Sequence, residues 1–272
     1  MKTILLAAWC VTPWCVTAEL SLHNPAFLGS CLRASSSLSP PLTGMLLWLK
    51  ADAISGKTNG EIFCVWTDSS GLGNSTTNKA LTSTSWPKYL TGQINGLPAV
   101  YFNATNNNRL DLATMFTSET SAEVFLVLCV TNDPGKGNNV GAWHFAGTGD
   151  FAIYPYTDGV IYDEFATTVR KTVGNPTPAL TAWNVYNTTS TNGEWTARLN
   201  RTQLFTTASN TFTNGANGIS GTQRFLALQP GGTGGFNGMM AEIILYGRIL
   251  SSTERTTTLS YLTNKYAGVL VF

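Results

Sequence analysis

Side chains suited to sugar recognition are concentrated in the second half of the sequence. They are the aromatic and polar residues Trp143, His144, Asp150, Tyr154, Tyr156, Asp158, Tyr162 and Trp195. A sugar ring can lay its C–H face on an exposed aromatic ring while Asp, Asn or backbone groups hydrogen-bond its hydroxyls. We therefore expect a carbohydrate-binding site among these residues. The alternative interpretation is that the rings belong to the core or to an interface, as aromatic side chains of a β-sandwich commonly do.

Carboxylates that could cleave a glycosidic bond lack the required spacing. Such a pair must face one cleft, and the side chains of a strand alternate between its two faces. Asp163 and Glu164 are adjacent and so face opposite sides of a strand, while Glu119 and Glu123 have the wrong spacing. We interpret these carboxylates as exposed surface groups.

Histidine provides no clear base for a nucleophilic mechanism. The two histidines are His23, in a segment rich in Ser, Leu and Pro, and His144. We interpret His144 as a hydrogen-bonded strand residue. Because the sequence shows neither a carboxylate pair nor a nucleophilic triad, we expect that the protein is not an enzyme.

One loop concentrates oxygen ligands and glycines. It runs from Asp68 through Ser-Ser-Gly-Leu-Gly to Asn74. Calcium requires several carboxylate or carbonyl oxygens, and this loop offers a single carboxylate. We interpret Asp68 and Asn74 as turn formers that hydrogen-bond the backbone of their own loop. We expect no cofactor, with a calcium site at Asp68 and Asn74 as the weaker alternative.

The composition narrows the classes of function. Only 11% of the 272 residues are charged and the formal net charge is +1, whereas about a quarter of residues are charged in an average protein. Such a surface has no basic patch for nucleic acid or for anionic lipid. It suits a protein outside the cytoplasm, or one packed into a large assembly through uncharged polar contacts.

The five cysteines are an odd number and cannot all form disulfides within one chain. Cys10, Cys15 and Cys31 lie near the N-terminus, whereas Cys64 and Cys129 fall on expected strands. Their spacing fits no metal motif, and we interpret them as buried free thiols.

The C-terminal segment predicts a strand followed directly by a capped helix. Residues 240–246 form an apolar run bounded by glycines and too short for a typical helix, which indicates a buried strand. Ser251 and Glu254 have the spacing of a capping box, in which each side chain accepts a hydrogen bond from the other's backbone N–H. Apolar residues then recur at helical spacing, at Leu259, Leu262 and Tyr266.

Many short strands separated by Gly/Asn turns predict a β-sandwich. The expected strands are 45–50, 99–102, 122–130, 143–146, 151–154, 160–162, 181–186, 194–199, 224–228 and 240–246. Residues 122–130 are apolar on both faces after Glu123, which predicts a central strand covered on both sides. Trp66 is expected in the core.

Four blocks of the sequence resemble the concanavalin A-like lectin/glucanase superfamily, in particular its laminin-G-like jelly-roll domains. They are Leu46-Leu-Trp-Leu-Lys-Ala-Asp52, Trp66-Thr-Asp-Ser-Ser-Gly-Leu-Gly-Asn74, Ile94-Asn-Gly-Leu-Pro-Ala-Val-Tyr-Phe102 and the closing segment from Gly235 to Tyr266. The resemblance implies an all-β fold: a two-sheet antiparallel jelly-roll sandwich with a short C-terminal helix, whose first strand pairs near its last. It leaves function open, because the superfamily contains lectins, glycosidases and structural modules. The acidic Glu-x-Asp-x-x-Glu run of the glucanase branch is not found in this sequence.

The N-terminal region is expected to lie outside the domain. We place an extended N-terminal arm or linker at 1–43 and the jelly-roll domain at 44–272. Residues 1–18 have a basic start and an apolar middle, so they are either a secretory signal or an arm that docks on a partner. They are too short to span a membrane.

These observations favour a non-catalytic structural or display protein of a virus particle, of the phage head-decoration or tail type. Its jelly roll would face outward on the virion surface and bind cell-surface glycans. The arm 1–43 and the apolar tail 268–272 would bind other subunits, so we expect an oligomer or assembly component that binds no nucleic acid. The alternative is a secreted bacterial carbohydrate-binding or adhesion module, and a glycoside hydrolase is the third interpretation.

Overall fold

The computed structural model describes residues 38–77, 82–136, 141–145, 151–214, 224–228 and 234–270. Residues from Leu38 onward form one compact unit. Residues 1–37 of the expected arm 1–43 lie outside the described residues, as do the last two residues of the tail. Cys10, Cys15, His23 and Cys31 fall in this undescribed part.

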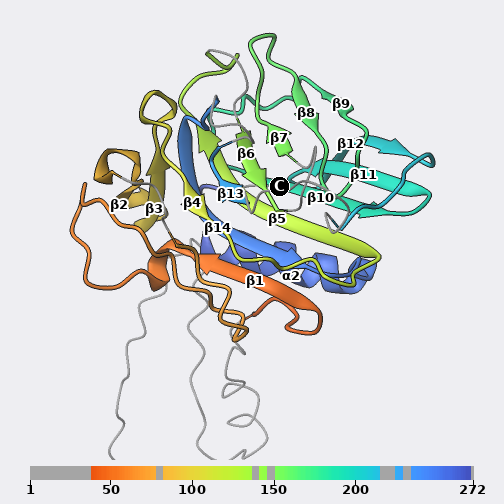
Figure 1. Ribbon diagram of the computed structural model, residues 1–272, viewed down its shortest axis with the longest axis horizontal. Coiled ribbons are helices and arrows are strands. Elements are labelled where there is room, and N and C mark those ends of the chain that lie inside the picture. Colours follow the sequence, from red (N-terminus) through yellow and green to blue (C-terminus); the bar gives the residue numbers. More distant parts are fainter. Residues whose placement is uncertain are drawn as a thin grey trace, which may run out of the picture. The chain divides into compact units, whose positions relative to one another are not determined.

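Two antiparallel sheets make up the fold of the described residues (Figure 1). The larger, eight-stranded sheet has the order β12-β11-β10-β5-β14-β3-β2, with β1 also pairing with β14. Its strands are β1 (Met45–Lys50), β2 (Lys88–Ile94), β3 (Leu97–Phe102), β5 (Ser121–Val130), β10 (Asn184–Thr191), β11 (Glu194–Leu199), β12 (Thr202–Thr207) and β14 (Gly238–Tyr246). The smaller, six-stranded sheet has the order β4-β13-β6-β7-β8-β9. Its strands are β4 (Leu110–Asp111), β6 (Gly141–His144), β7 (Phe151–Ile153), β8 (Ile161–Asp163), β9 (Lys171–Gly174) and β13 (Phe225–Leu226).

Strand β14 brings the two ends of the domain together. Its first residues pair with β3, and after an irregularity between Met240 and Glu242 its remaining residues pair with β1. Lys50 faces Glu242 and Met45 faces Tyr246 in this register. The expectation that the first strand lies beside the last is confirmed, and so is the all-β sandwich.

A core of large apolar side chains fills the space between the sheets. Every residue of β5 after Ser121 is buried, because its neighbours β10 and β14 and the layers on both sides enclose it. Trp66 is fully buried, as expected. Burial of this apolar surface is the main force that holds the two sheets together.

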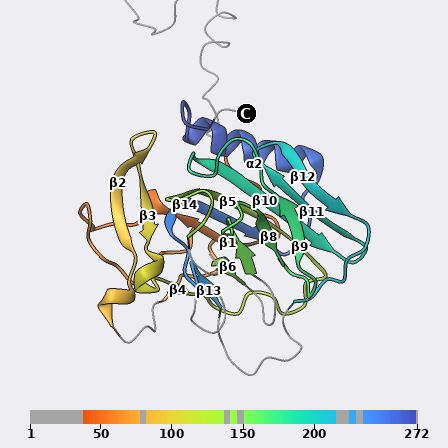
Figure 2. The ribbon, with the colours of Figure 1, turned by 90° about the horizontal axis from the view of Figure 1, so that it is seen from above.

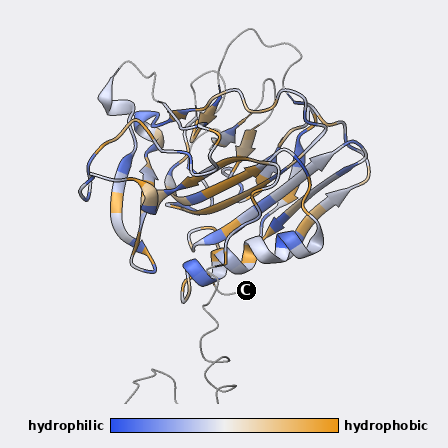
Figure 3. Ribbon diagram, turned by 90° about the horizontal axis from the view of Figure 1, so that it is seen from below, coloured by the Kyte–Doolittle hydropathy of each residue, from blue (hydrophilic) through white to orange (hydrophobic). Residues whose placement is uncertain are grey.

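The helix α2 (Ser252–Lys265) forms a third layer on the outer face of the larger sheet (Figure 2). Ser251 caps it with the expected capping box, both of whose hydrogen bonds are present. Leu259, Leu262 and Tyr266 are buried against the sheet. The strands at the centre of the larger sheet are strongly hydrophobic, whereas α2 is mostly neutral to hydrophilic (Figure 3). Among the described residues, no helix has the length and apolar character needed to cross a membrane.

Some elements differ from those expected. Strand β10 begins at Asn184 and continues to Thr191, beyond the expected 181–186. The sequence from Asn187 to Thr191 is entirely polar, yet residues 187–190 are buried and hydrogen-bond neighbouring strands and loops. Periodicity of apolar residues cannot detect such a strand. The short turns of 3-10 helix at Ala51–Ala53, Ser83–Ser85 and Ala104–Asn106 and the strands β2, β4, β9 and β12 were also missed.

The two described cysteines are free thiols. Cys129 lies on β5 and is buried, and burial raises its pKa to about 12. Cys64 is only half-buried and lies outside a strand, so the expectation of a buried strand cysteine is wrong at this position.

Candidate functional site

Three of the aromatic residues expected to bind sugar lie in the core. Trp143, Tyr154 and Trp195 each have 0% exposed surface. The Trp143 ring stacks on Tyr186 with centroids 5.6 Å apart, and the indole N–H of Trp195 donates to the Phe165 carbonyl at 3.0 Å. A ring without an exposed face cannot stack on a sugar. The structure therefore corrects the expectation for these three residues, whose side chains point between the sheets.

The remaining candidates fall into three cases. Asp150 lies outside the described residues. His144 is on β6 and is 3% exposed. Tyr156, Asp158 and Tyr162 lie at the surface and in contact with one another. The last three residues, together with Arg170, are called the tyrosine ledge below.

A tight turn between β7 and β8 positions two residues of the tyrosine ledge. The Gly159 N–H donates to the Tyr156 carbonyl at 3.0 Å, and the Tyr156 N–H donates to the Val160 carbonyl at 2.9 Å. Gly159 has φ +81°, a left-handed conformation that favours glycine. Asp158 accepts the Val160 N–H at 2.9 Å through its side chain, as an Asp in such a turn commonly does. The turn therefore holds Tyr156 and Asp158 in fixed positions.

Strand alternation places Tyr162 on the outer face of the smaller sheet. Its neighbours Ile161 and Asp163 are buried inside the sandwich, while Tyr162 is half-buried. The Tyr162 hydroxyl donates to Asp158 at 2.8 Å. Its ring meets the Tyr156 ring edge to face, with centroids 5.9 Å apart and an interplanar angle of 83°. Two aromatic rings thus stand at a right angle beside one carboxylate.

Arg170 adds a positive charge to the ledge. Its side chain is 54% exposed, and its guanidinium carbon lies 5.7 Å from the centroid of the Tyr162 ring. Its Nε also lies 3.3 Å from a carboxylate oxygen of Glu164. Both contacts fix the guanidinium beside the Tyr162 ring, and the exposed remainder of its donors faces solvent.

The hydrogen bonds of the ledge shift two pKa values. The Val160 N–H and then the Tyr162 hydroxyl hold the pKa of Asp158 below its usual range. The same carboxylate raises the pKa of Tyr162, because loss of the phenolic proton would place two negative charges side by side. Asp158 is therefore ionised and Tyr162 neutral at neutral pH. The ledge offers an anionic acceptor, two neutral rings and a cation.

A row of alternating polar and aromatic residues crosses the same sheet. The Cα partners in successive strands are Asp111, Phe225, His144 and Phe151, and the Glu164 N–H donates to the Phe151 carbonyl at 3.2 Å. Directly opposed residues of antiparallel strands point to the same face. The row thus places two carboxylates and an imidazole on one face of the smaller sheet.

The spacing of this row limits its chemistry. Neighbouring strands lie about 4.8 Å apart, so four strand steps put Asp111 and Glu164 about 19 Å apart. The two carboxyl groups of a glycosidase lie roughly 5 to 9.5 Å apart. Asp111 and Glu164 therefore cannot act together on one bond. The sequence did not reveal the row because β4 and β13 are only two residues long.

Several carboxylates expected at the surface are buried. Glu123 and Asp163 are 0% exposed and Glu164 is 8% exposed. Asp163 accepts the hydroxyls of Tyr186 at 2.9 Å and Thr188 at 3.0 Å. Burial of a carboxylate is tolerated where hydrogen bonds replace its water shell, and these partners lie in distant strands. The expectation of exposed carboxylates is wrong for these three residues.

The Asp68 loop uses its carboxylate to organise its own backbone. Asp68 accepts four hydrogen bonds of 2.7 to 2.9 Å, from the N–H groups of Trp48, Ser70 and Asn74 and from the Ser70 hydroxyl. The Asn74 amide donates to the Leu46 carbonyl at 2.8 Å. The loop is thereby fastened to β1. No group of three or more His, Cys, Asp or Glu side chains with metal-binding geometry occurs within the part of the chain that the structure describes.

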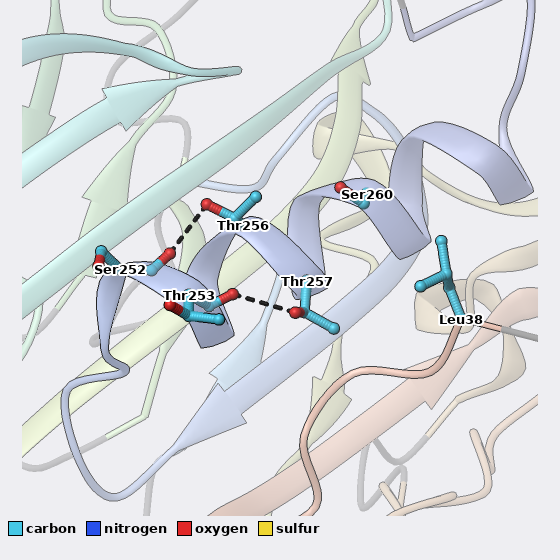
Figure 4. Close-up of a pocket in the computed structure, with 6 residues that line it drawn as sticks. All are labelled: Leu38, Ser252, Thr253, Thr256, Thr257 and Ser260. Carbon is cyan, nitrogen blue, oxygen red and sulfur yellow. Dashed lines mark hydrogen bonds between the residues drawn. The ribbon is translucent and has the colours of Figure 1, made fainter.

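A shallow groove of about 390 Å³ runs along the exposed side of α2 (Figure 4). Its lining consists of Leu38, Ser252, Thr253, Thr256, Thr257 and Ser260. The hydroxyls of Thr256 and Thr257 donate to the helix carbonyls of Ser252 and Thr253, at 2.8 and 3.0 Å. The groove contains no charged side chain, and its threonine hydroxyls already donate within the helix. It offers less specific recognition than the tyrosine ledge.

Comparison with known proteins gives structural matches only. The sequence matches no protein-family model and no curated protein. An arabinofuranosidase complexed with arabinofuranosyl-alpha-1,2-xylobiose is similar at 13% identity and a TM-score of 0.53, over 75% of this chain and 51% of that one. Trypanosoma rangeli sialidase in complex with 2,3-difluorosialic acid is similar at 12% identity and a TM-score of 0.49, over 84% of this chain and 34% of that one. The chain thus spans about half the length of the first and about a third of the second.

The arabinofuranosidase match corrects the expectation that the protein is not an enzyme. The arabinofuranosidase is a glycoside hydrolase, so this β-sandwich occurs in an enzyme that acts on carbohydrate. At 13% identity the match establishes the fold alone. Lack of the glucanase acidic run therefore does not make the chain non-catalytic.

Proposed function

We propose that the protein binds carbohydrate through the tyrosine ledge on the outer face of its smaller sheet. The observation that carries this proposal is the half-buried surface pair Tyr156 and Tyr162, held at a right angle beside Asp158. Rings of this kind present a flat apolar face to the C–H groups of a sugar. The similarity of the fold to an arabinofuranosidase agrees with a carbohydrate-related role.

The polar groups of the ledge match the hydroxyls of a sugar. Each carboxylate oxygen of Asp158 accepts one hydrogen bond from the protein, so each keeps a lone pair for a sugar hydroxyl. Arg170 carries donors on its exposed guanidinium. Since the turn and the sheet already fix these side chains, little conformational entropy is lost when a sugar binds.

Glycan-array screening of the full-length protein, followed by titration calorimetry with the best oligosaccharide, tests the proposal. Tyr162→Ala and Tyr156→Ala should each weaken binding by about tenfold, which corresponds to about 1.4 kcal/mol. Tyr101→Ala is the matched control, because Tyr101 is also half-buried but lies on β3 of the other sheet. Equal affinities for all three variants and the native protein would rule out the ledge as the site.

Cleavage of a glycosidic bond is the second candidate function. It is favoured by the similarity of the fold to an arabinofuranosidase and by Glu164, whose carboxylate lies 3.3 Å from Arg170 of the tyrosine ledge. Release of reducing ends from array-positive polysaccharides measures this activity directly. The activity should disappear in Glu164→Gln and persist in Glu119→Gln, whose carboxylate lies in the connection before β5.

We further propose that the sandwich is of the laminin-G-like type and that it works at the surface of a virus particle. The pairing of β1 with β14 supports the first point, and the low content of charged residues supports the second. In this setting residues 1–43 and 268–272 bind neighbouring subunits. Mass spectrometry of the natural protein decides between the particle and secretion, because a secreted form would begin near Glu19.

A further inference from the structure

A second surface cavity lies on the opposite side of the larger sheet from the smaller sheet. It has a volume of about 260 Å³ and opens between the first turns of α2 and strand β11. It is lined by Arg198, Arg201, Ser252, Arg255, Thr256 and Leu259. Three of its six lining residues are arginines, in a chain with only 11% charged residues.

The arginines of this cavity differ in how their charges are balanced. Arg255 donates to both carboxylate oxygens of the buried Glu123, at 2.7 and 2.9 Å. Glu123 also accepts the Leu250 N–H at 2.9 Å and the Asn187 amide at 3.0 Å. Four donors therefore occupy this carboxylate, and its single negative charge is neutralised by Arg255.

Arg198 is held beside the cavity without a carboxylate in direct contact. Its guanidinium donates to the neutral side-chain oxygen of Asn187 at 3.2 Å. Burial and then the neighbouring charge of Arg255 lower the pKa of Arg198. Glu123 and Glu194 raise this pKa, but only through electrostatic attraction at longer range. An anion placed in the cavity would relieve both unfavourable effects, because it supplies the missing negative charge next to Arg198.

The remaining groups of the cavity suit an oxyanion. Guanidinium groups recognise carboxylate, sulfate and phosphate oxygens through paired N–H donors. Ser252 provides a hydroxyl, and the cavity lies against the N-terminal turn of α2, where the helix dipole favours negative charge. A volume of about 260 Å³ is large enough for one such group together with several waters.

We propose that this cavity is an oxyanion-binding site, which takes a sulfate, a phosphate or an acidic substituent of a polysaccharide. It lies on the α2 side of the larger sheet, whereas the tyrosine ledge lies on the outer face of the smaller sheet. The two sites are therefore independent, and either proposal can fail while the other holds.

Titration calorimetry on the full-length protein, with inorganic sulfate and phosphate against chloride at equal ionic strength, tests this site. A sulfated oligosaccharide and its desulfated counterpart are titrated in parallel, which separates a free ion from a polymer substituent as the source of the anion. Arg198→Gln and Arg201→Gln should each weaken binding of the preferred anion by about tenfold or more. Lys88→Gln, which removes one exposed cation from β2, should leave the affinity unchanged.

The possible results separate clearly. Binding of either anion source that is lost in both arginine variants and kept in Lys88→Gln supports the site. No binding beyond that of chloride, or equal weakening in all three variants, overturns it. Arg198→Lys covers the case in which the glutamine variant does not fold, because it keeps the charge but loses the paired donors and should still bind more weakly than the native protein.

Discussion

Arg255 of α2 donates two hydrogen bonds, of 2.7 and 2.9 Å, to Glu123 of β5, although 132 positions of sequence separate the two residues. At the other end of the same helix, Lys265 lies 2.7 Å from Glu242 of β14. Both carboxylates are fully buried. Two ion pairs therefore fix the helix to the larger sheet, one on each side of the apolar contact between the helix and the sheet.

Removal of one partner of the first pair should destabilise the protein strongly. Arg255→Ala leaves the buried charge of Glu123 uncompensated, and such a change typically costs about 3–5 kcal/mol. Chemical denaturation monitored by circular dichroism measures this loss. Lys57→Ala removes a pair between partly exposed side chains and should change the free energy of unfolding very little. A small effect of Arg255→Ala would show that the helix is held by its apolar face alone.

The capping region should make stability depend on pH in the acid range. The hydrogen bonds from Arg248, and then those from Ser251, lower the pKa of Glu254 from 4.5 to about 2. Since the folded pKa lies below that of the unfolded chain, the stabilisation is complete above about pH 4.5 and is lost as the pH falls toward 2.

The variant Glu254→Gln isolates this contribution. The difference in Tm between the native protein and Glu254→Gln should be constant near neutrality and should shrink as the pH falls through this window. Thermal denaturation at a series of pH values measures it. A difference that does not change between pH 6 and pH 2 would contradict the assignment of the pKa shift to Glu254.

Trp143 should act on stability and not on sugar binding. Trp143→Ala removes a fully buried ring that stacks on Tyr186, and such truncations cost about 3–5 kcal/mol. Below the Tm of the variant, its affinity for glycans should equal that of the native protein. Calorimetric titration on the folded variant provides the comparison. Loss of binding without loss of stability would instead place Trp143 at the ligand.

Local signals in the sequence correctly predicted β5, β14 and the start of α2. The capping box needs only residues 251 and 254, so the start of α2 can be found from four adjacent positions. The apolar runs of β5 and β14 likewise predicted buried strands, because burial on both faces requires an apolar residue at almost every position.

The candidate site was only partly predictable, because exposure depends on register between distant strands. Tyr162 of β8 and Trp143 of β6 are aromatic residues of short strands in the same sheet, yet alternation places one outside the sheet and the other inside. A shift of one residue would exchange them. Glu123 and Arg255 illustrate the same limit, because neither residue's neighbours in sequence indicate that the two are paired.

A crystal structure of the full-length protein with the oligosaccharide selected on the array tests the central claim most directly. We predict a sugar ring stacked on Tyr156 or Tyr162, with a hydroxyl hydrogen-bonded to Asp158 and a second within reach of Arg170. A sugar bound in the groove along α2, or anywhere else away from the outer face of the smaller sheet, would contradict the claim.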